Sequence, residues 1–113
     1  MATKRDRLKI AKVLKDAKAL VKKGWTKNTF AVDIDGKGCP IVSPDAVAFC
    51  MIGALTRANM DTYELFSPAL TELNNNIPDE FNYQIVDFND HPKTTKRKVL
   101  NVFTKAIKQL EAN

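Results

Sequence analysis

The sequence predicts a mostly helical α+β fold, in which four to five helices surround a buried central helix beside one small β-hairpin. Three observations support this prediction: an amphipathic segment near each end, an apolar segment between them, and an alternating stretch that ends in a turn signal. The chain has 113 residues, of which 44% are hydrophobic, so it can bury a core without a disulfide or a metal. We therefore expect a single globular domain over residues 1–113.

The first helix is predicted over residues 5–23. Its apolar residues recur at helical spacing and its lysines occupy the other side. The apolar residues are Ile10, Val13, Leu14, Ala17, Leu20 and Val21. Gly24 follows where a left-handed residue commonly ends a helix, and Trp25 is placed for the hydrophobic contact that closes such an end.

The hairpin is predicted over residues 29–42. Apolar residues alternate along its first strand, at Phe30, Val32 and Ile34. Asp35-Gly36 has the chemistry of a two-residue turn, and this turn would place Val32 opposite Cys39. Two strands are marginal alone, so the hairpin is expected to lie against helices.

The central helix is predicted to start at Ser43-Pro44-Asp45, which supplies an N-cap hydroxyl, a proline and a first-turn acid. The segment that follows, Ala46–Ala58, is apolar nearly all the way round, as expected of a buried helix. Gly53 lowers helix propensity within it, so we expect another element to approach the helix closely there.

Three further elements are predicted in the C-terminal half. Asp61 and Glu64 form a pattern similar to a capping box, so the next helix is expected to begin there. Tyr83, Ile85, Val86 and Phe88 form a short apolar stretch, which is either extended or one helical turn. A last amphipathic helix begins after Thr94 or Thr95.

Charged residues are sorted along the chain. Residues 1–27 carry net charge +8, residues 28–92 carry −8 and residues 93–113 carry +5. Both basic ends have an apolar stripe, so we expect packed helices whose lysines form a basic surface. The lysines predicted to meet a protein or nucleic acid are Lys9, Lys12, Lys15, Lys22, Lys98, Lys105 and Lys108. Lysine outnumbers arginine fourteen to four, which disfavours base readout.

Several short motifs occur in a fixed order. They are Gly24-Trp25-Thr26, Ala31-x-Asp33-x-x-Gly36, Ala46-x-x-x-Cys50-x-x-Gly53-Ala54-Leu55, and Phe88-Asn89-Asp90 before Thr95-Lys96-x-x-Val99-Leu100. In these motifs the chain resembles a family of small uncharacterised proteins of actinobacteria, proteobacteria and their phages. Family members usually carry tryptophan where this chain has Phe88, and their last helix has fewer lysines. The resemblance implies a bacterial or phage origin and one compact domain, and it brings no activity. Its structural signature residues are Gly24, Trp25, Asp33, Gly36, Cys50 and Gly53.

The sequence contains no complete catalytic or metal-binding set. Cys50, Asp90 and His91 are the types that a thiol hydrolase uses, but a free cysteine in an apolar segment behaves as a small buried hydrophobe. Two cysteines and one histidine fall short of a four-ligand zinc site. The acids from Asp33 to Gly36 fit a turn better than a calcium loop. We therefore expect a protein that is not an enzyme and uses no cofactor or metal.

Asn89 and Asp90 form a separate candidate site. Just before a helix, an amide and a carboxylate commonly satisfy free backbone donors. The alternative is contact with a polar ligand, neutral or cationic because Asp90 disfavours an anion. That alternative would place a small-molecule site between the hairpin, the helical segment 50–55 and Asn89-Asp90.

The favoured function is that of a small bacterial or phage accessory protein that binds another macromolecule, either a host or a phage protein. By analogy with small phage proteins, its process would be counter-defence or host modulation. Non-specific nucleic-acid binding by the lysine-rich helices and small-molecule binding are the alternatives. We find no signal-peptide pattern and no apolar run of membrane-spanning length, so we expect no membrane partner and a cytoplasmic location, in the host if the gene is a phage gene. The oligomeric state stays open.

Overall fold

The computed structural model describes residues 3–112 and has the predicted fold class, with five α-helices and a two-stranded antiparallel sheet in this part of the chain. Two short 3-10 turns, η1 and η2, complete it. The elements are α1 (Lys4–Lys23), β1 (Ala31–Val32), β2 (Ala48–Phe49), α2 (Met51–Ala58), η1 (Tyr63–Leu65), α3 (Phe66–Asn74), η2 (Asp79–Phe81), α4 (Ile85–Asp90) and α5 (Lys96–Glu111).

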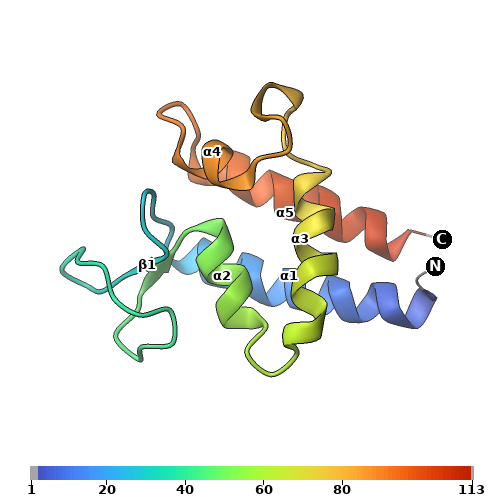
Figure 1. Ribbon diagram of the computed structural model, residues 1–113, viewed down its shortest axis with the longest axis horizontal. Coiled ribbons are helices and arrows are strands. Elements are labelled where there is room, and N and C mark those ends of the chain that lie inside the picture. The colour runs from blue at the N-terminus through green and yellow to red at the C-terminus, as the bar shows by residue number, and fades with distance from the viewer. Residues whose placement is uncertain (1–2, 113) are drawn as a thin grey trace.

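The helices form two layers (Figure 1). α1 and α5 run antiparallel and side by side, so the start of α1 lies next to the end of α5. Contacts between the first half of α1 and the end of α5 fix this arrangement: the Arg7 guanidinium donates to the Ala112 carbonyl at 3.1 Å, and Lys15 Nζ lies 2.5 Å from Glu111 Oε2. α2 and α3 pack across one face of the pair.

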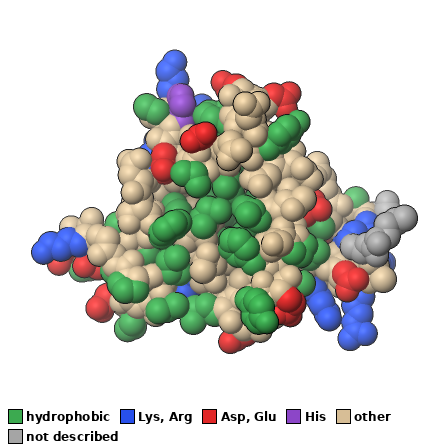
Figure 2. Space-filling model, viewed as in Figure 1, with side chains coloured by type: hydrophobic (Ala, Val, Ile, Leu, Met, Phe, Trp, Pro, Cys, Tyr) green, Lys and Arg blue, Asp and Glu red, His purple; other side chains and the backbone are tan. Residues whose placement is uncertain are grey.

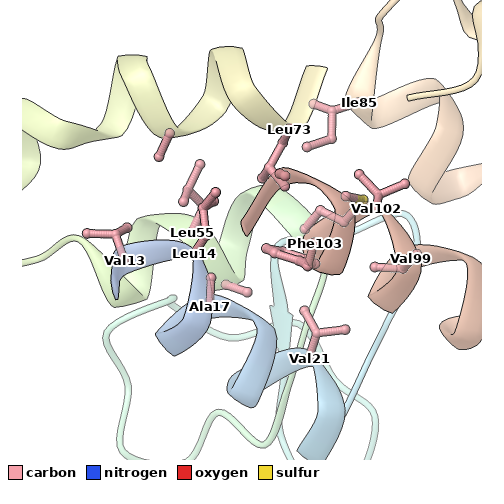
Figure 3. Packing of buried hydrophobic residues seen from close by; sticks show 14 of the residues in the cluster. Val13, Leu14, Ala17, Val21, Leu55, Leu73, Ile85, Val99, Val102 and Phe103 are labelled. Atoms are coloured by element: carbon pink, nitrogen blue, oxygen red, sulfur yellow. The ribbon is translucent and has the colours of Figure 1, made fainter. Parts of the chain in front are cut away.

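The core lies between these layers (Figure 3). The apolar stripes predicted for both terminal helices face each other there, and Leu55 of α2 and Leu73 of α3 meet them. Leu14 and Phe103 are fully buried at the centre. The cap predicted for the last helix is Thr95, whose hydroxyl accepts the Lys98 N–H at 3.3 Å.

The sheet has a different second strand from the predicted one. Ala31–Val32 pairs with Ala48–Phe49, and only a single bridge joins Val32 to Gly38. The predicted two-residue turn is wrong because the Asp33 N–H donates to the Lys37 carbonyl at 2.9 Å, which encloses a three-residue loop. The Asp33 carboxylate accepts two amides inside this loop and Gly36, with φ of 79°, supplies its left-handed position.

The central helix begins at Met51, so the predicted start at Ser43 is wrong. Ser43 instead closes a turn, in which its carbonyl accepts the Ala46 N–H at 3.2 Å and its hydroxyl accepts the Asp45 N–H at 3.1 Å. The next residues then extend to form β2. The N-cap is Cys50, whose Sγ accepts the Gly53 N–H at 3.3 Å.

Gly24 is extended, with φ of −166°, and does not adopt the predicted left-handed conformation. Glycine is required there for another reason: a Cβ would lie 2.3 Å from the Val47 carbonyl oxygen. The Gly24 carbonyl also accepts the Phe49 N–H at 3.0 Å, so β2 passes directly over the end of α1.

Two other boundaries differ from or refine the predictions. The helix expected at Asp61 starts later, because η1 comes first, its N-cap Thr62 makes no side-chain cap bond, and α3 begins at Phe66. In residues 83–88 the helical alternative is correct, and α4 continues to Asp90. Within residues 3–112, none of the helices combines the length and apolar character needed to cross a membrane.

Candidate functional site

Asn89 is the centre of a buried hydrogen-bond network that joins three parts of the chain. Its Oδ1 accepts the Trp25 indole N–H at 2.9 Å and the Met51 backbone N–H at 3.0 Å. Its Nδ2 donates to the Thr26 carbonyl at 3.2 Å and to Asp90 Oδ1 at 2.9 Å. An amide side chain offers two donors and two acceptor positions, so all four are used within the protein.

The network shows which backbone groups the side chains of Asn89 and Asp90 bind. Both residues end α4, and the backbone donor that Asn89 satisfies belongs to the first turn of α2 rather than to α5. Asp90 Oδ1 also accepts the Asn28 N–H at 2.8 Å, which holds the left-handed residue after the first helix in place. Both side chains thus connect the exit of α1 to the start of α2.

Trp25 serves as the anchor expected at the end of the first helix. It is half-buried against the core, and its indole N–H is bonded to Asn89. The Lys27 ammonium lies 5.2 Å from the centre of its ring and donates to the His91 carbonyl at 2.6 Å. Contacts within the protein therefore cover most of the tryptophan side chain.

The candidate thiol-hydrolase residues do not share one hollow. Cys50 and Asp90 line a cavity of about 170 Å³, whereas His91 lines a neighbouring depression with Glu80 and Asp87. His91 Nδ1 accepts the Lys93 N–H at 3.1 Å, and its ring packs edge-on against Phe81. Within residues 3–112, no group of His, Cys, Asp and Glu side chains is close enough to hold a metal ion.

The Cys50 thiol is expected to react slowly. Burial raises its pKa, and the side chain is only 8% exposed, so the reactive thiolate is scarce at neutral pH. In the folded protein, iodoacetamide should alkylate the half-buried Cys39 at least about tenfold faster than Cys50 at pH 7. A time course of peptide masses measures both rates, and a sample in denaturant provides the control. Equal rates in the folded protein would contradict this assignment.

The cavity beside Cys50 is apolar and partly open. Its apolar lining comes from Phe30, Ile52 and Val86, and its polar lining includes Asn89 and Asp90. Phe30 is 54% exposed and Val86 is 53% exposed, although both are large apolar residues. The predicted small-molecule junction is therefore hollow rather than fully packed.

A second apolar hollow, of about 430 Å³, lies at the other end of α2. Thr56, Met60, Tyr63 and Phe66 line it, and Tyr63 is 81% exposed. One half-buried row connects the two hollows, because residues four apart on a helix are neighbours and α2 has Ile52 and Thr56 at that spacing. We call this surface the α2 face, made of Phe30, Ile52, Thr56, Met60, Tyr63, Phe66 and Val86.

The α2 face carries no charge. Figure 2 shows hydrophobic side chains gathered at the centre of this side of the molecule, with acidic groups around them and basic groups at the margin. The charged residue of α2 itself is Arg57, and its guanidinium is turned away to the carbonyls of Ile41 and Ser43, at 2.6 and 2.9 Å. Contiguous apolar surface of this kind commonly marks an interaction site.

The predicted lysine surface has a different location. The seven lysines named from the sequence are all exposed and lie on α1 or α5. The buried stripes of both helices face the same core, so the lysines point away from it, and Lys9 and Lys12 line a hollow of about 1080 Å³ between α1 and the segment that follows α2. The lysines of α1 therefore do not all lie on the side of the molecule opposite α2 and α3.

Sequence reasoning did not identify the α2 face. Phe30 was predicted as a hairpin residue and Ile52 as part of a fully buried helix, while Met60 and Tyr63 fell in a predicted turn and helix start. The available signal was the absence of charge from Ala46 to Ala58 apart from Arg57. That signal is equally typical of a buried helix, so it could not show which side is exposed.

Comparison with known proteins gives one match. A family model described as a family of unknown function, DUF6197, matches residues 5–109. No curated protein matches the chain, and no solved structure does. The match covers every helix of the structure, from α1 to most of α5.

Proposed function

Because the chain belongs to DUF6197, a family of unknown function, we propose its function from the geometry: it is a non-enzymatic accessory protein that binds another protein through the α2 face. The observation that carries this proposal is the uncharged apolar surface between two hollows on α2 (Figure 2). Folding alone gives no reason to leave Phe30 and Val86 exposed at one hollow and Tyr63 exposed at the other. Large apolar and aromatic side chains are also the residues that dominate protein interfaces.

The biological setting that we propose is bacterial or phage, inside the cytoplasm, and the partner is a host or phage protein. Counter-defence or modulation of the host fits a small protein without a complete catalytic set. The polar groups around Asn89 are bonded to one another, so this network has a structural role and leaves the α2 face as the candidate for binding.

Changing Val86 to glutamate is expected to abolish partner binding. A charge at the mouth of the apolar cavity would have to be desolvated in the complex, while its exposed position in the free protein tolerates the change. We would compare the proteins that the tagged wild type and the variant capture from a bacterial lysate, by quantitative mass spectrometry. At least one stoichiometric partner should fall about tenfold or more in Val86→Glu.

Ile34→Glu is the matched control, because Ile34 is 86% exposed and lies in the loop after β1, among Asp33 and Asp35. This control should capture the same partner as the wild type. If every captured protein binds Val86→Glu as well as the wild type, the α2 face is not the interface.

A second candidate function is non-specific nucleic-acid binding, favoured by the excess of basic residues on α1 and α5. α1 and α5 together contain fourteen Lys and Arg residues and three acids. An array of this kind releases counterions from a phosphate backbone, so its affinity depends steeply on salt.

This second candidate predicts micromolar binding to duplex DNA that is lost between about 50 and 200 mM salt. The variant Lys12→Glu, Lys15→Glu, Lys105→Glu, Lys108→Glu should lose it at every salt concentration, whereas Lys37→Glu, outside both helices, should not. Fluorescence anisotropy with a labelled duplex measures this. Binding that survives in the fourfold variant would exclude the lysine surface.

A further inference from the structure

The acidic groups at the α4 end of the α2 face define the chemistry of its partner. Beside the apolar cavity, Glu80, Asp87 and Asp90 line a depression of about 500 Å³ that shares Val86 and Asp90 with it. At the other end, Asp61 and Glu64 are exposed but line a separate hollow with Lys4, Arg5, Lys9 and Lys12 of α1, so that end offers no net acidic surface. No Lys or Arg is among the described residues that line the two apolar hollows or the depression.

The two hollows also fix the spacing of the apolar groups that can occupy them. They lie at the two ends of α2, whose 8 residues span about 12 Å at the helical rise. Seven or eight residues of a helix, or four residues of an extended chain, cover the same distance. A segment with two apolar anchors at this spacing can fill both hollows at once.

The size of the first cavity sets the size of its anchor. Its volume of about 170 Å³ is close to that of an apolar cavity, roughly 150 Å³, that holds one benzene molecule. A leucine, methionine or phenylalanine side chain therefore fits. The Cys50 thiol at the wall adds no charge, because burial raises its pKa.

We propose that the α2 face binds a short basic segment of a partner protein, which places one apolar side chain in each hollow and lysine or arginine residues beside Glu80, Asp87 and Asp90 at the α4 end. This inference rests on the proposed protein-binding function and adds the charge and spacing of the partner. Opposite charges around an apolar centre steer the encounter and set the register. A lone apolar patch without the acids would not select a basic partner.

Selection from a random peptide library tests the inference without knowledge of the partner. The full-length chain is the bait, and bound peptides are sorted by whether they also bind Val86→Glu or the control Ile34→Glu. A second bait, Glu80→Lys with Asp87→Lys, inverts the charge at one end while leaving the apolar hollows in place. Both substituted acids are exposed, so this bait is expected to fold.

The expected result is a set of peptides that bind the wild type and Ile34→Glu but not Val86→Glu. These peptides should carry two large apolar residues at the stated spacing, with lysine or arginine beside them. Their affinity should fall about tenfold or more on the charge-inverted bait and weaken with rising salt.

Two results would overturn the inference in distinguishable ways. Peptides that depend on Val86 but show no basic bias, or bind the charge-inverted bait equally well, would exclude the basic partner while leaving protein binding at the α2 face intact. A selection that yields no peptide sensitive to Val86→Glu would contradict both the inference and the proposed function.

Discussion

Replacing Asn89 with alanine is expected to lower the free energy of unfolding by about 4 kcal/mol, because it leaves two buried donors without partners. The Trp25 indole N–H and the Met51 backbone N–H both donate to the Asn89 side chain, which is 2% exposed. Each unsatisfied buried group costs about 1–3 kcal/mol, and the missing side chain leaves a small void. Urea denaturation followed by the fluorescence of Trp25, the single tryptophan, measures the loss.

Asn101→Ala provides the control for this prediction. Asn101 is an exposed residue of α5, so the same substitution there should change stability by no more than about 0.5 kcal/mol. If Asn89→Ala is as stable as Asn101→Ala, the network does not hold α2 to the end of α1.

Replacing Gly53 with alanine is expected to destabilise the protein by about 3 kcal/mol, although alanine is the better helix former. A Cβ at this position would lie 2.0 Å from the Phe30 carbonyl oxygen and 2.9 Å from its carbonyl carbon. Both are backbone atoms just before β1, so relief requires movement of the chain. Propensity alone would raise stability by about 1 kcal/mol, so the two effects differ in sign.

The matched change is Gly38→Ala, measured by the same denaturation. Its Cβ would meet only the Thr29 hydroxyl, at 3.5 Å, which is ordinary van der Waals contact. This variant should stay within about 0.5 kcal/mol of the wild type. A Gly53→Ala protein more stable than the wild type would contradict the close approach of Phe30 to α2.

The terminal helices could be predicted from the sequence because the apolar spacing and the cap that indicate each helix lie within one continuous segment. Helical spacing of apolar residues gave both buried stripes, and Thr95 was one of two predicted caps. Gly53 was correctly predicted to mark a close approach for a similar reason, since glycine inside a helix needs a packing explanation.

The middle of the chain was harder to predict because its local signals conflict with its tertiary contacts. Ser43-Pro44-Asp45 has the composition of a helix start, yet Ala48 and Phe49 gain more by pairing with β1 and passing over Gly24. A short apolar run does not reveal whether it forms a strand or a helix. Asn89 likewise bonds residues 38 and 64 positions away, so its partners could not be seen in the sequence.

The two candidate surfaces also differ in how far the sequence predicts them. The lysine rows follow directly from the helical period, whereas the α2 face joins residues of the β1 approach, α2, η1, α3 and α4, which meet only in the folded chain. Which side of an apolar helix is exposed depends on which other helices and strands pack against it. That information lies in the packing, and no pattern within residues 46–58 encodes it.

Photo-crosslinking in cells tests most directly whether the α2 face is the partner surface. A benzophenone side chain would replace Tyr63 on the α2 face, Asn101 between the lysines of α5, or Ile34 in the loop after β1, all three exposed. The proposed function predicts a discrete protein adduct from position 63 and none from position 34. Adducts from position 101 or 34 alone, with none from position 63, would contradict it.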